Sequence, residues 1–558
     1  MLTVLNIIVG GTLTTCLLFL ITDQPCRTAL KTQWKKICMI LFLALVWRVP
    51  MQGHLFYGLE YEDSYVYTVA GRYLSAGVQA CSPASSCYLT TVCAVGNSHS
   101  CKIPQTFSGH YIGYPFIIAV ASRLVGYSPA IGIYLSLVAA LSEVVLVFLA
   151  CEMIEPGGIA GLAGSLIFAL TPVFAVNGVG AYSEPVSSAL VVMSFVLCFR
   201  LLNPNKRGSS FSLLINWLAL TFSALLAATV KRENVLLIPV IVLAGLLLDT
   251  QNNDAARGRK WLRHLMVGGS CCICLAFTVV QLQLFRTLRS ETAEYAVFPF
   301  NPEVFRTMFP LFVKSYASVG WYLGGAVFVI LGVVGSRQSR RRGIYAIAVF
   351  VAYLLLYTSH VRSYYELQGG STSEFDTIRY SMNVAGLWSI IAGLGFGYLK
   401  TVLIAGRIGT LVRQHSRVIL WVGIVGYVLS SWVLTSRLRE DMIADESAER
   451  IEPAMSALEV VGKLGPENTF VITLEPLVIQ MLSREPVNVI DFGYLNTKLA
   501  QGLAKDNPNL TFLYVEQAIY ASQADRERYG EGFDFVGRVP KVLLCRGDKY
   551  SLYQIELP

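Results

Sequence analysis

Long apolar runs divide most of the chain into segments about as long as a membrane-spanning helix. A helix that crosses the hydrocarbon core of a bilayer needs roughly 20 mostly apolar residues. The pattern predicts about twelve crossings, near residues 3–21, 37–52, 128–150, 157–176, 185–202, 211–230, 233–248, 264–284, 316–335, 344–359, 381–399 and 418–435. No positive segment precedes the first run and no small-residue cleavage site follows it, so we expect a retained span there.

The composition agrees with this pattern. Of the 558 residues, 54% are hydrophobic and 14% are charged, and the mean hydropathy is +0.55. A soluble protein carries roughly 25% charged residues. The composition therefore excludes a soluble multidomain enzyme and predicts a polytopic α-helical membrane protein.

Basic residues are concentrated in alternate loops between the predicted spans. Loops rich in Lys and Arg face the cytoplasm, so the cytoplasmic side should hold the clusters at 27–36, 200–207, 257–263, 337–342 and 400–417. The extracytoplasmic (periplasmic, extracellular or lumenal) side should then hold the opposite loops, at 53–127, 177–184, 285–315 and 360–380, and everything after 436. Both chain ends should lie on that side.

Charge also separates the chain into two expected domains. Residues 1–435 carry 31 Lys+Arg against 17 Asp+Glu, whereas residues 436–558 carry 13 against 19. The basic excess lies in the membrane part, where it sets topology, so we expect no nucleic-acid partner. We predict a transmembrane domain over 1–435 that includes the external loop 53–127, and an extracytoplasmic domain over 436–558.

Short apolar runs predict a small α/β fold for the last domain. The runs at 470–474, 487–491, 511–515 and 541–545 are typical of buried strands, and 550–557 is a candidate edge strand. We find no glycine-rich phosphate loop, HExxH or nucleophile elbow in this segment. An accessory or acceptor-facing role is therefore expected for it.

Four of the 13 cysteines lie close together in the first external loop, in a polar segment. One or two disulfides are the natural interpretation on an oxidising side of the membrane, and three pairings are open among Cys81, Cys87, Cys93 and Cys101. A zinc site is the rival interpretation, but the spacing does not fit the usual knuckles.

Charged residues at the ends of spans are candidates for chemistry, because an unpaired charge in hydrocarbon is costly. Glu60, Glu62 and Asp63 open an amphipathic helix outside the second span. Asp63, Tyr67, Ala70 and Arg72 share roughly one face of it. The alternative explanation is that these acids simply favour the positive end of a helix.

Three further charged segments lie on the same predicted side. Glu184 precedes a proline at the start of an apolar helix, where capping is the alternative explanation. Lys231 and Arg232 lie in a tight connection between two spans, where ordinary snorkelling is the alternative. Arg379 and Tyr380 precede a late span, and an arginine fork suits a phosphate or diphosphate.

The shared side of these segments predicts a site for an anionic, lipid-borne substrate. A carboxylate there could act as general base on an acceptor hydroxyl, and the cations could stabilise a departing phosphate.

Two other features of the sequence bear less directly on this site. The segment 111–126 is short and contains Pro115 and Arg123, which suggests an interfacial helix. Glu143, in mid-helix, should face the bundle interior with a polar partner; a proton relay is the rival interpretation.

Five motifs in this order resemble those of the GT-C superfamily of integral-membrane glycosyltransferases, which take sugar from a polyprenyl-phosphate carrier. The superfamily includes the protein O-mannosyltransferases and the lipid A aminoarabinose transferase. The motifs are D-S-x-x-Y-x-x-A-x-R at 63–72, H-Y-x-x-Y-P at 110–115, Y-S-E-P at 182–185, K-R-E-N-x-L-L-x-P at 231–239 and R-Y at 379–380. The resemblance covers roughly residues 37–435 and implies, in addition, a small external domain.

The resemblance implies a role for each matching residue. Asp63 matches the acid used as catalytic base or as a metal-linked acid, and Glu184 the acid that positions the acceptor or a metal. Many protein O-mannosyltransferases have Asp-Glu where this chain has Asp63-Ser64, with Glu62 on the other side. Lys231, Arg232 and Arg379 resemble the contacts to the carrier phosphate, and Arg379 is the better match. His110 and Tyr114 lie where the loop of the family packs over the site, with a structural role as the alternative. We also expect Glu62, Tyr67 and Tyr380 among the substrate-binding residues.

These observations predict an inverting glycosyltransferase that moves a sugar from a polyprenyl-phosphate-linked donor to a glycan, glycolipid or protein acceptor on the extracytoplasmic face. No obligatory cofactor is expected, although a divalent metal is compatible with the family. A transporter or flippase for a lipid-linked glycan is the alternative, but such proteins usually contain internal repeats, which we do not find. A membrane protein whose external domain binds a ligand would leave the shared side of Asp63, Glu184 and Arg379 unexplained.

Overall fold

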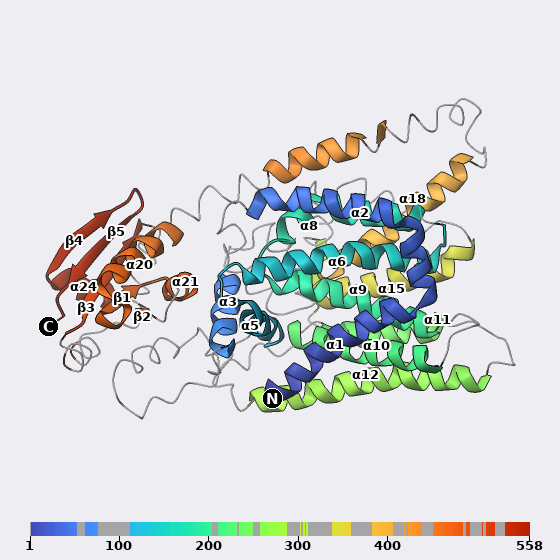
Figure 1. Cartoon of the computed structure of the whole chain (residues 1–558), viewed down its shortest axis with the longest axis horizontal. Helices are drawn as coiled ribbons and strands as arrows, with labels where there is room; N and C mark the ends of the chain where they lie inside the picture. Colours follow the sequence, from blue (N-terminus) through green and yellow to red (C-terminus); the bar gives the residue numbers. More distant parts are fainter. Residues whose placement is uncertain are drawn as a thin grey trace.

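The computed structural model consists of a body of long helices and a small domain with a β-sheet beyond it (Figure 1). It describes residues 2–52, 62–75, 112–157, 159–202, 210–231, 234–248, 257–286, 337–358, 382–404, 425–437, 450–483, 487–491, 509–518 and 530–557, with a few isolated positions between them. The helices of the body are α1 (Leu2–Thr22), α2 (Gln24–Gln52), α3 (Glu62–Ser75), α5 (Gly113–Val125), α6 (Ile131–Ile154), α7 (Ile159–Leu170), α8 (Pro172–Asn177), α9 (Ser183–Leu202), α10 (Ser210–Val230), α11 (Asn234–Leu248), α12 (Arg257–Arg286), α15 (Arg337–Thr358) and α18 (Ala385–Ile404).

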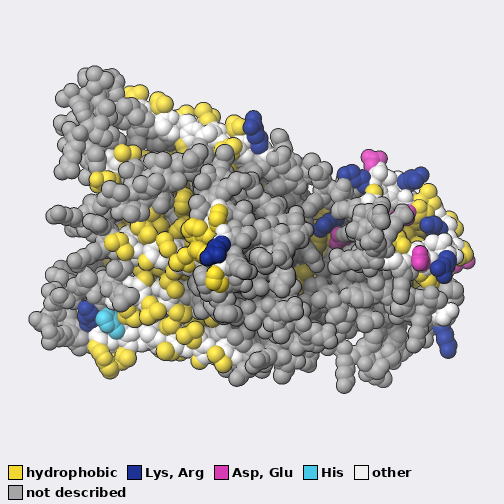
Figure 2. Space-filling model, turned by 180° about the vertical axis from the view of Figure 1, so that it is seen from behind, with side chains coloured by type: hydrophobic (Ala, Val, Ile, Leu, Met, Phe, Trp, Pro, Cys, Tyr) yellow, Lys and Arg dark blue, Asp and Glu magenta, His cyan; other side chains and the backbone are white. Residues whose placement is uncertain are grey.

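The prediction of a polytopic helical membrane protein is confirmed. Among the described residues, six helical stretches are long and apolar enough to cross a bilayer: Thr3–Thr22, Ile131–Ile154, Ser183–Leu202, Ser210–Val230, Lys260–Val279 and Met382–Leu399. The predicted span at 316–335 lies outside the described residues, so the number of crossings stays a prediction. Hydrophobic side chains cover much of the described surface of the helical body, whereas charged ones gather on the small domain (Figure 2).

Burial differs strongly among these helices. Helix α9 is enclosed along almost its whole length, whereas α1 and α12 expose most of their surface. Leu13 and Leu17 of α1, for example, are 67% and 60% exposed. An exposed apolar face is what a helix next to lipid requires, because lipid tails are as apolar as leucine. Helix α9 is therefore a central element, and polar groups on it are shielded from lipid.

Three basic clusters that we expected in loops belong to helices. Helix α2 begins at Gln24, and α12 and α15 begin at Arg257 and Arg337, so the clusters at 27–36, 257–263 and 337–342 are helical. In α2 the cause is visible: the Asp23 carboxylate accepts a hydrogen bond from the Cys26 N–H at 3.1 Å, which caps the first turn. Lys and Arg are also good helix formers.

The predicted span at 157–176 is divided into α7 and α8. Pro172 has no N–H and disfavours helical geometry in the residue before it, and Thr171 is extended (φ −63°, ψ 123°). The carbonyls freed by such a break need other donors within a membrane. The fully buried Arg48 donates to the freed carbonyl of Ala169 at 2.9 Å. It also donates to the carbonyl of Phe174 at 3.2 Å, which accepts the Gly178 N–H as well.

The small domain is an α/β fold, as predicted. Its strands are β1 (Thr469–Thr473), β2 (Asn488–Asp491), β3 (Thr511–Gln517), β4 (Lys541–Arg546) and β5 (Tyr550–Ile555), and its helices are α20 (Glu452–Leu464), α21 (Pro476–Leu482) and α24 (Gly530–Arg538). The strand order is β2-β1-β3-β5-β4; β1 pairs in parallel with β2 and β3, and β5 pairs antiparallel with β3 and β4. Side chains alternate between the faces: Phe470 and Phe512 pack with α24, and Val471 and Leu513 pack with α20 and α21.

Two strand predictions are wrong: the strand expected to be buried lies at the sheet edge, and the strand expected at the edge lies inside the sheet. The run at 541–545 was expected to be buried, but all six residues of β4 are exposed at the sheet edge. The segment at 550–557 was expected at the edge, but β5 lies between β3 and β4. A short apolar run does not distinguish an edge from a central strand, because the neighbours of a strand are set by tertiary topology.

Helices α3 and α5 lie between the bundle and the small domain (Figure 1). Val66 and Val69 of α3 and Leu137 of α6 belong to one hydrophobic cluster with residues of α20, α21 and the sheet, including Ala457 and Val478. The two parts of the chain therefore share a continuous apolar core. The amphipathic helix predicted to open with Glu60, Glu62 and Asp63 corresponds to α3, which is located where the two parts meet.

Candidate active site

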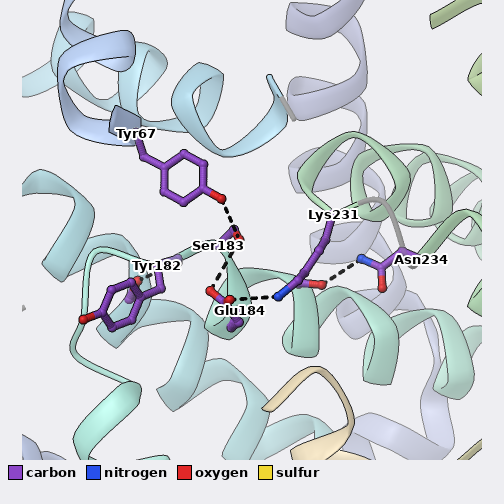
Figure 3. Close-up of polar contacts among 8 residues, drawn as sticks. Tyr67, Tyr182, Ser183, Glu184, Lys231 and Asn234 are labelled. Carbon is purple, nitrogen blue, oxygen red and sulfur yellow. Dashed lines mark hydrogen bonds and ion pairs between the residues drawn. The ribbon is translucent and has the colours of Figure 1, made fainter. Parts of the chain in front are cut away.

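Helix α9 begins with a polar segment that neighbouring helices enclose (Figure 3). Ser183, Glu184, Ser187 and Ser188 occupy its first two turns, and each is at most 3% exposed. Pro185 suits this position because its fixed φ favours the first turn and its missing N–H is not needed there. Buried polar groups need partners, and partners come from several other parts of the chain.

Glu184 and Lys231 form a buried ion pair. The Nζ atom of Lys231 lies 2.8 Å from Oε1 of Glu184, and the residues are 8% and 3% exposed. Lys231 directly follows α10 and continues it by one backbone hydrogen bond, to the carbonyl of Ala227. The lysine therefore turns inward to a carboxylate and does not snorkel to the surface. Removing either partner would take away a close opposite charge that offsets the burial of the other.

Helix α3 approaches this ion pair through Tyr67. The Tyr67 hydroxyl lies 3.4 Å from that of Ser183, which in turn donates to Oε2 of Glu184 at 3.4 Å (Figure 3). Asp63 lies in the first turn of α3, four residues before Tyr67, and so on the same side of the helix. Its backbone is therefore next to the turn that contacts α9.

Tyr114 of α5 supports Tyr67 from a second side. The two rings meet edge to face with their centroids 5.3 Å apart. The buried Tyr114 hydroxyl donates to the Gly132 carbonyl at 2.9 Å and lies 3.1 Å from the Ser136 hydroxyl, which also bonds the Tyr182 carbonyl. Tyr114 thus links α5, α6 and the segment before α9.

Asn234 joins the start of α11 to α9 and α10. Its side-chain amide donates to Ser187 Oγ at 2.7 Å and to the Ala227 carbonyl at 2.9 Å. Its backbone N–H bonds the Lys231 carbonyl at 3.2 Å. The connection that carries Lys231 is therefore held on both sides, which fixes the direction of the lysine.

Glu143 lies inside the bundle, as its position in mid-helix predicts. It is 1% exposed, and Oε1 accepts a hydrogen bond from the Ser188 hydroxyl at 2.6 Å. Gly386, near the start of α18, approaches so closely that a Cβ there would lie 2.4 Å from Oε1. The carboxylate thus links α6 and α9 to the first turn of α18, and its polar partner confirms the expected inward orientation.

Several predicted residues cannot be placed in this site. His110, Arg232, Arg379 and Tyr380 lie outside the described residues, as do the four cysteines of the first external loop, Cys81, Cys87, Cys93 and Cys101. For Glu62 and Asp63 the structure describes the helical backbone alone. Within the described part of the chain, no group of three or more His, Cys, Asp or Glu side chains could hold a metal ion.

The structure brings together Glu184, Lys231, Tyr67 and Tyr114, and it adds neutral residues that sequence reasoning missed. Ser183, Ser187 and Asn234 are fully or almost fully buried; Ser183 bonds Tyr67 and Glu184, and Asn234 bonds Ser187. Ser183 and Asn234 lie in the motifs Y-S-E-P and K-R-E-N, and Ser187 follows the first motif by two residues. The signal that could have found them was their place beside a charged residue at a span end.

No protein-family model matches the sequence, and no curated protein is similar to it. Several solved structures, in contrast, are similar to this chain. Over 94% of this chain and 98% of the other, the fold is similar to ArnT from Cupriavidus metallidurans in the apo state, with a TM-score of 0.60 and 14% identity. The chain has the fold of the GT-C membrane glycosyltransferases. This confirms the fold that the five motifs suggested.

Two further GT-C structures were solved with a lipid phosphate. ArnT from Cupriavidus metallidurans bound to undecaprenyl phosphate gives a TM-score of 0.58 at 13% identity, with the same coverage of both chains. The archaeal oligosaccharyltransferase AglB from Archaeoglobus fulgidus, in complex with an inhibitory peptide and a dolichol-phosphate, gives 0.55 at 10% identity over 95% of this chain and 75% of that one. The small domain is covered as well, so the GT-C fold extends over nearly the whole chain.

Proposed function

We propose that this protein is an inverting glycosyltransferase that moves a sugar from a polyprenyl-phosphate-linked donor to an acceptor on the extracytoplasmic face of the membrane. The buried Glu184–Lys231 pair carries the proposal. It places a lysine inside a membrane protein, at the end of a central helix and beside the helix of Asp63. Ionisable groups at such positions mark substrate pathways in membrane proteins.

The fold supports a lipid-linked donor. Proteins of the same fold were solved with undecaprenyl phosphate and with a dolichol-phosphate. Lys231 has an ammonium with three donors, and such a group can bind a phosphate oxygen while it keeps its bond to Glu184. In this proposal Glu184 orients Lys231, and Arg232, Arg379 and Tyr380 complete the contacts to the donor.

The proposed reaction is a single displacement at the anomeric carbon. Asp63 takes the proton of the acceptor hydroxyl as its oxygen forms the new glycosidic bond. The bond between the anomeric carbon and the phosphate oxygen breaks, and its electron pair leaves with the lipid phosphate, where Lys231 stabilises the negative charge. One displacement inverts the configuration. Tyr67, through Ser183, links the helix of Asp63 to Glu184.

The test is transfer by the purified, full-length protein in lipid vesicles. A labelled polyprenyl-phosphate sugar should be consumed with release of free polyprenyl phosphate, which a transporter or flippase does not produce. Asp63→Asn should lower release by roughly a hundredfold or more with an unchanged melting temperature. Asp534→Asn, at an exposed carboxylate of α24, is the matched control and should remain fully active. Full activity of Asp63→Asn would remove Asp63 from the mechanism.

A further inference from the structure

The last turn of α3 is bonded to the end of a helix in the small domain. Nη1 of Arg72 donates to the Gln480 carbonyl at 2.5 Å, to the Ser483 carbonyl at 3.0 Å and to the Ser483 hydroxyl at 2.9 Å. These acceptors lie at the C-terminal end of α21, where carbonyls have no helical partner and carry partial negative charge. Arg72 therefore caps a helix that is more than 400 residues away in the sequence, with a sequence separation of 408 to Gln480.

Tyr127, in the connection between α5 and α6, completes this joint. The Arg72 guanidinium lies over its ring, with 4.8 Å between Cζ and the centroid, a geometry that favours a cation–π interaction. The Tyr127 hydroxyl donates to the Met481 carbonyl at 2.7 Å. Two residues of the body thus bond three residues, Gln480, Met481 and Ser483, at one end of α21.

The same end of α3 is held from the membrane body as well. Arg123 of α5 donates from Nε to the Ser75 carbonyl at 3.0 Å and from Nη2 to the Leu74 carbonyl at 2.8 Å. Arg123 therefore caps α3, and Arg72 of α3 caps α21. Nearer to Asp63, the hydrogen bond from α3 to α9 is the 3.4 Å contact between Tyr67 and Ser183, which is long and therefore weak.

We infer that Arg72 is a positioning residue for the transfer reaction. Asp63 lies nine residues before Arg72 on one rigid helix, about 13 Å along its axis, so a rotation of the Arg72 end displaces the Asp63 end. By capping α21, Arg72 makes the small domain set the orientation of α3 and thereby the position of Asp63 relative to the Glu184–Lys231 pair. This inference rests on the proposed function, and it assigns the small domain a role in catalysis without a contact to the substrate.

Hydrogen exchange measured by mass spectrometry on the full-length protein tests the joint without relying on activity. In Arg72→Ala, amides of α3 over residues 66–74 should exchange about tenfold faster, while amides of α9 and α20 keep their rates. Arg72→Lys retains one charged donor and should fall between the wild type and Arg72→Ala. Lys463→Ala, on the exposed face of α20, should match the wild type.

Kinetics separate positioning from a purely structural contact. Arg72→Ala should lower kcat about tenfold, because small misplacements of a catalytic group are costly, and leave the donor KM within about twofold. Arg123→Gln, which removes a cap of α3 and keeps the bonds to α21, should lower kcat less than Arg72→Ala.

Three results would overturn the inference. The first is unchanged exchange in α3; the second is faster exchange with an unchanged kcat; the third is a KM effect without a kcat effect. If Arg72→Ala loses its fold, faster exchange everywhere will reveal it, and Arg72→Lys then decides the outcome. If the wild type itself transfers no sugar, the proposed function fails, while the exchange result still decides whether Arg72 holds α3.

Discussion

Two Lys–Glu ion pairs of nearly equal length lie in opposite surroundings in this protein. Lys231 and Glu184 are 2.8 Å apart, with side chains 9% and 4% exposed. Lys463 and Glu459 of α20 are 2.7 Å apart, with side chains 69% and 70% exposed. The two pairs have nearly the same N–O distance, but they differ strongly in how far their side chains are exposed to solvent.

The difference follows from solvation. Water screens an exposed pair, so its net contribution to stability is small. A buried pair has lost its water, and each charge depends on the other for compensation. The buried pair is therefore the one whose disruption should matter for both stability and function, and it lies at the proposed site.

Breaking the buried pair should have the largest effect. Lys231→Ala leaves the Glu184 carboxylate enclosed without its cation, so we expect the free energy of unfolding to fall by about 3–5 kcal/mol. Thermal unfolding in detergent measures this change. Transfer should fall at least roughly a hundredfold, because a donor to the developing phosphate charge is lost.

The double variant Lys231→Met with Glu184→Gln separates the two effects. It removes both charges and conserves approximate volume, so stability should return to within about 1–2 kcal/mol of the wild type while transfer stays low. Unchanged stability in Lys231→Ala would show that the two charges do not depend on each other.

Glu143 is a second buried acid, and it extends the comparison because its hydrogen-bond donor is a neutral hydroxyl and not a cation. Glu143 accepts from Ser188 and lies against Gly386. Gly386→Ala would place a Cβ 2.3 Å from Val192 Cγ2 and 2.4 Å from Glu143 Oε1. Such overpacking should destabilise the protein by about 1–3 kcal/mol, measured by thermal unfolding.

The matched control for this variant is Gly268→Ala in α12. Nothing lies within 4 Å of a Cβ at Gly268, and alanine is the better helix former by roughly 1 kcal/mol. Gly268→Ala should therefore leave stability unchanged or raise it slightly. Equal effects of the two substitutions would mean that the close approach of Gly386 is not what matters.

The sequence predicted the charged members of the site better than the contacts among them. Glu184 and Lys231 stood out because charge at a span end is rare, but their pairing joins residues 47 positions apart. Ser187 and Asn234 carry no charge and are common residue types, so their nearness to a charged residue at a span end was the one signal that pointed to them. Only packing brings Asn234 within 2.7 Å of Ser187.

For the fold as well, the sequence predicted local features better than tertiary contacts. Apolar runs located the helices, because length and hydropathy are local properties. Run length could not reveal that Pro172 ends α7 and that Arg48 bonds the carbonyls near the break. Likewise, the apolar letters of β4 predicted burial, whereas its place at the edge depends on which strands pair.

A second, largely buried ion pair at the other end of α9 should have an intermediate effect. Arg200 Nε lies 2.5 Å from Asp23 Oδ2, with side chains 14% and 1% exposed, and Asp23 also caps α2 through Cys26. Asp23→Asn keeps a capping oxygen and loses the charge, so stability should fall by about 1–2 kcal/mol. Asp23→Ala removes both interactions and should cost about 1 kcal/mol more. Equal melting temperatures of Asp23→Asn and Asp23→Ala would show that the cap does not contribute to stability.

Breaking the exposed pair should have the smallest effect. The hydrogen bond from Lys463 and its positive charge lower the pKa of Glu459. A lowered pKa contributes stability above the unfolded-state value of about 4.3, and this contribution is lost as the pH falls through the folded-state value. Because both side chains are solvated, we expect Lys463→Ala to leave the melting temperature unchanged across that pH range, within the error of a thermal scan. A clear loss near neutral pH that disappears in acid would show that this pair stabilises α20, and that burial alone does not separate the two pairs.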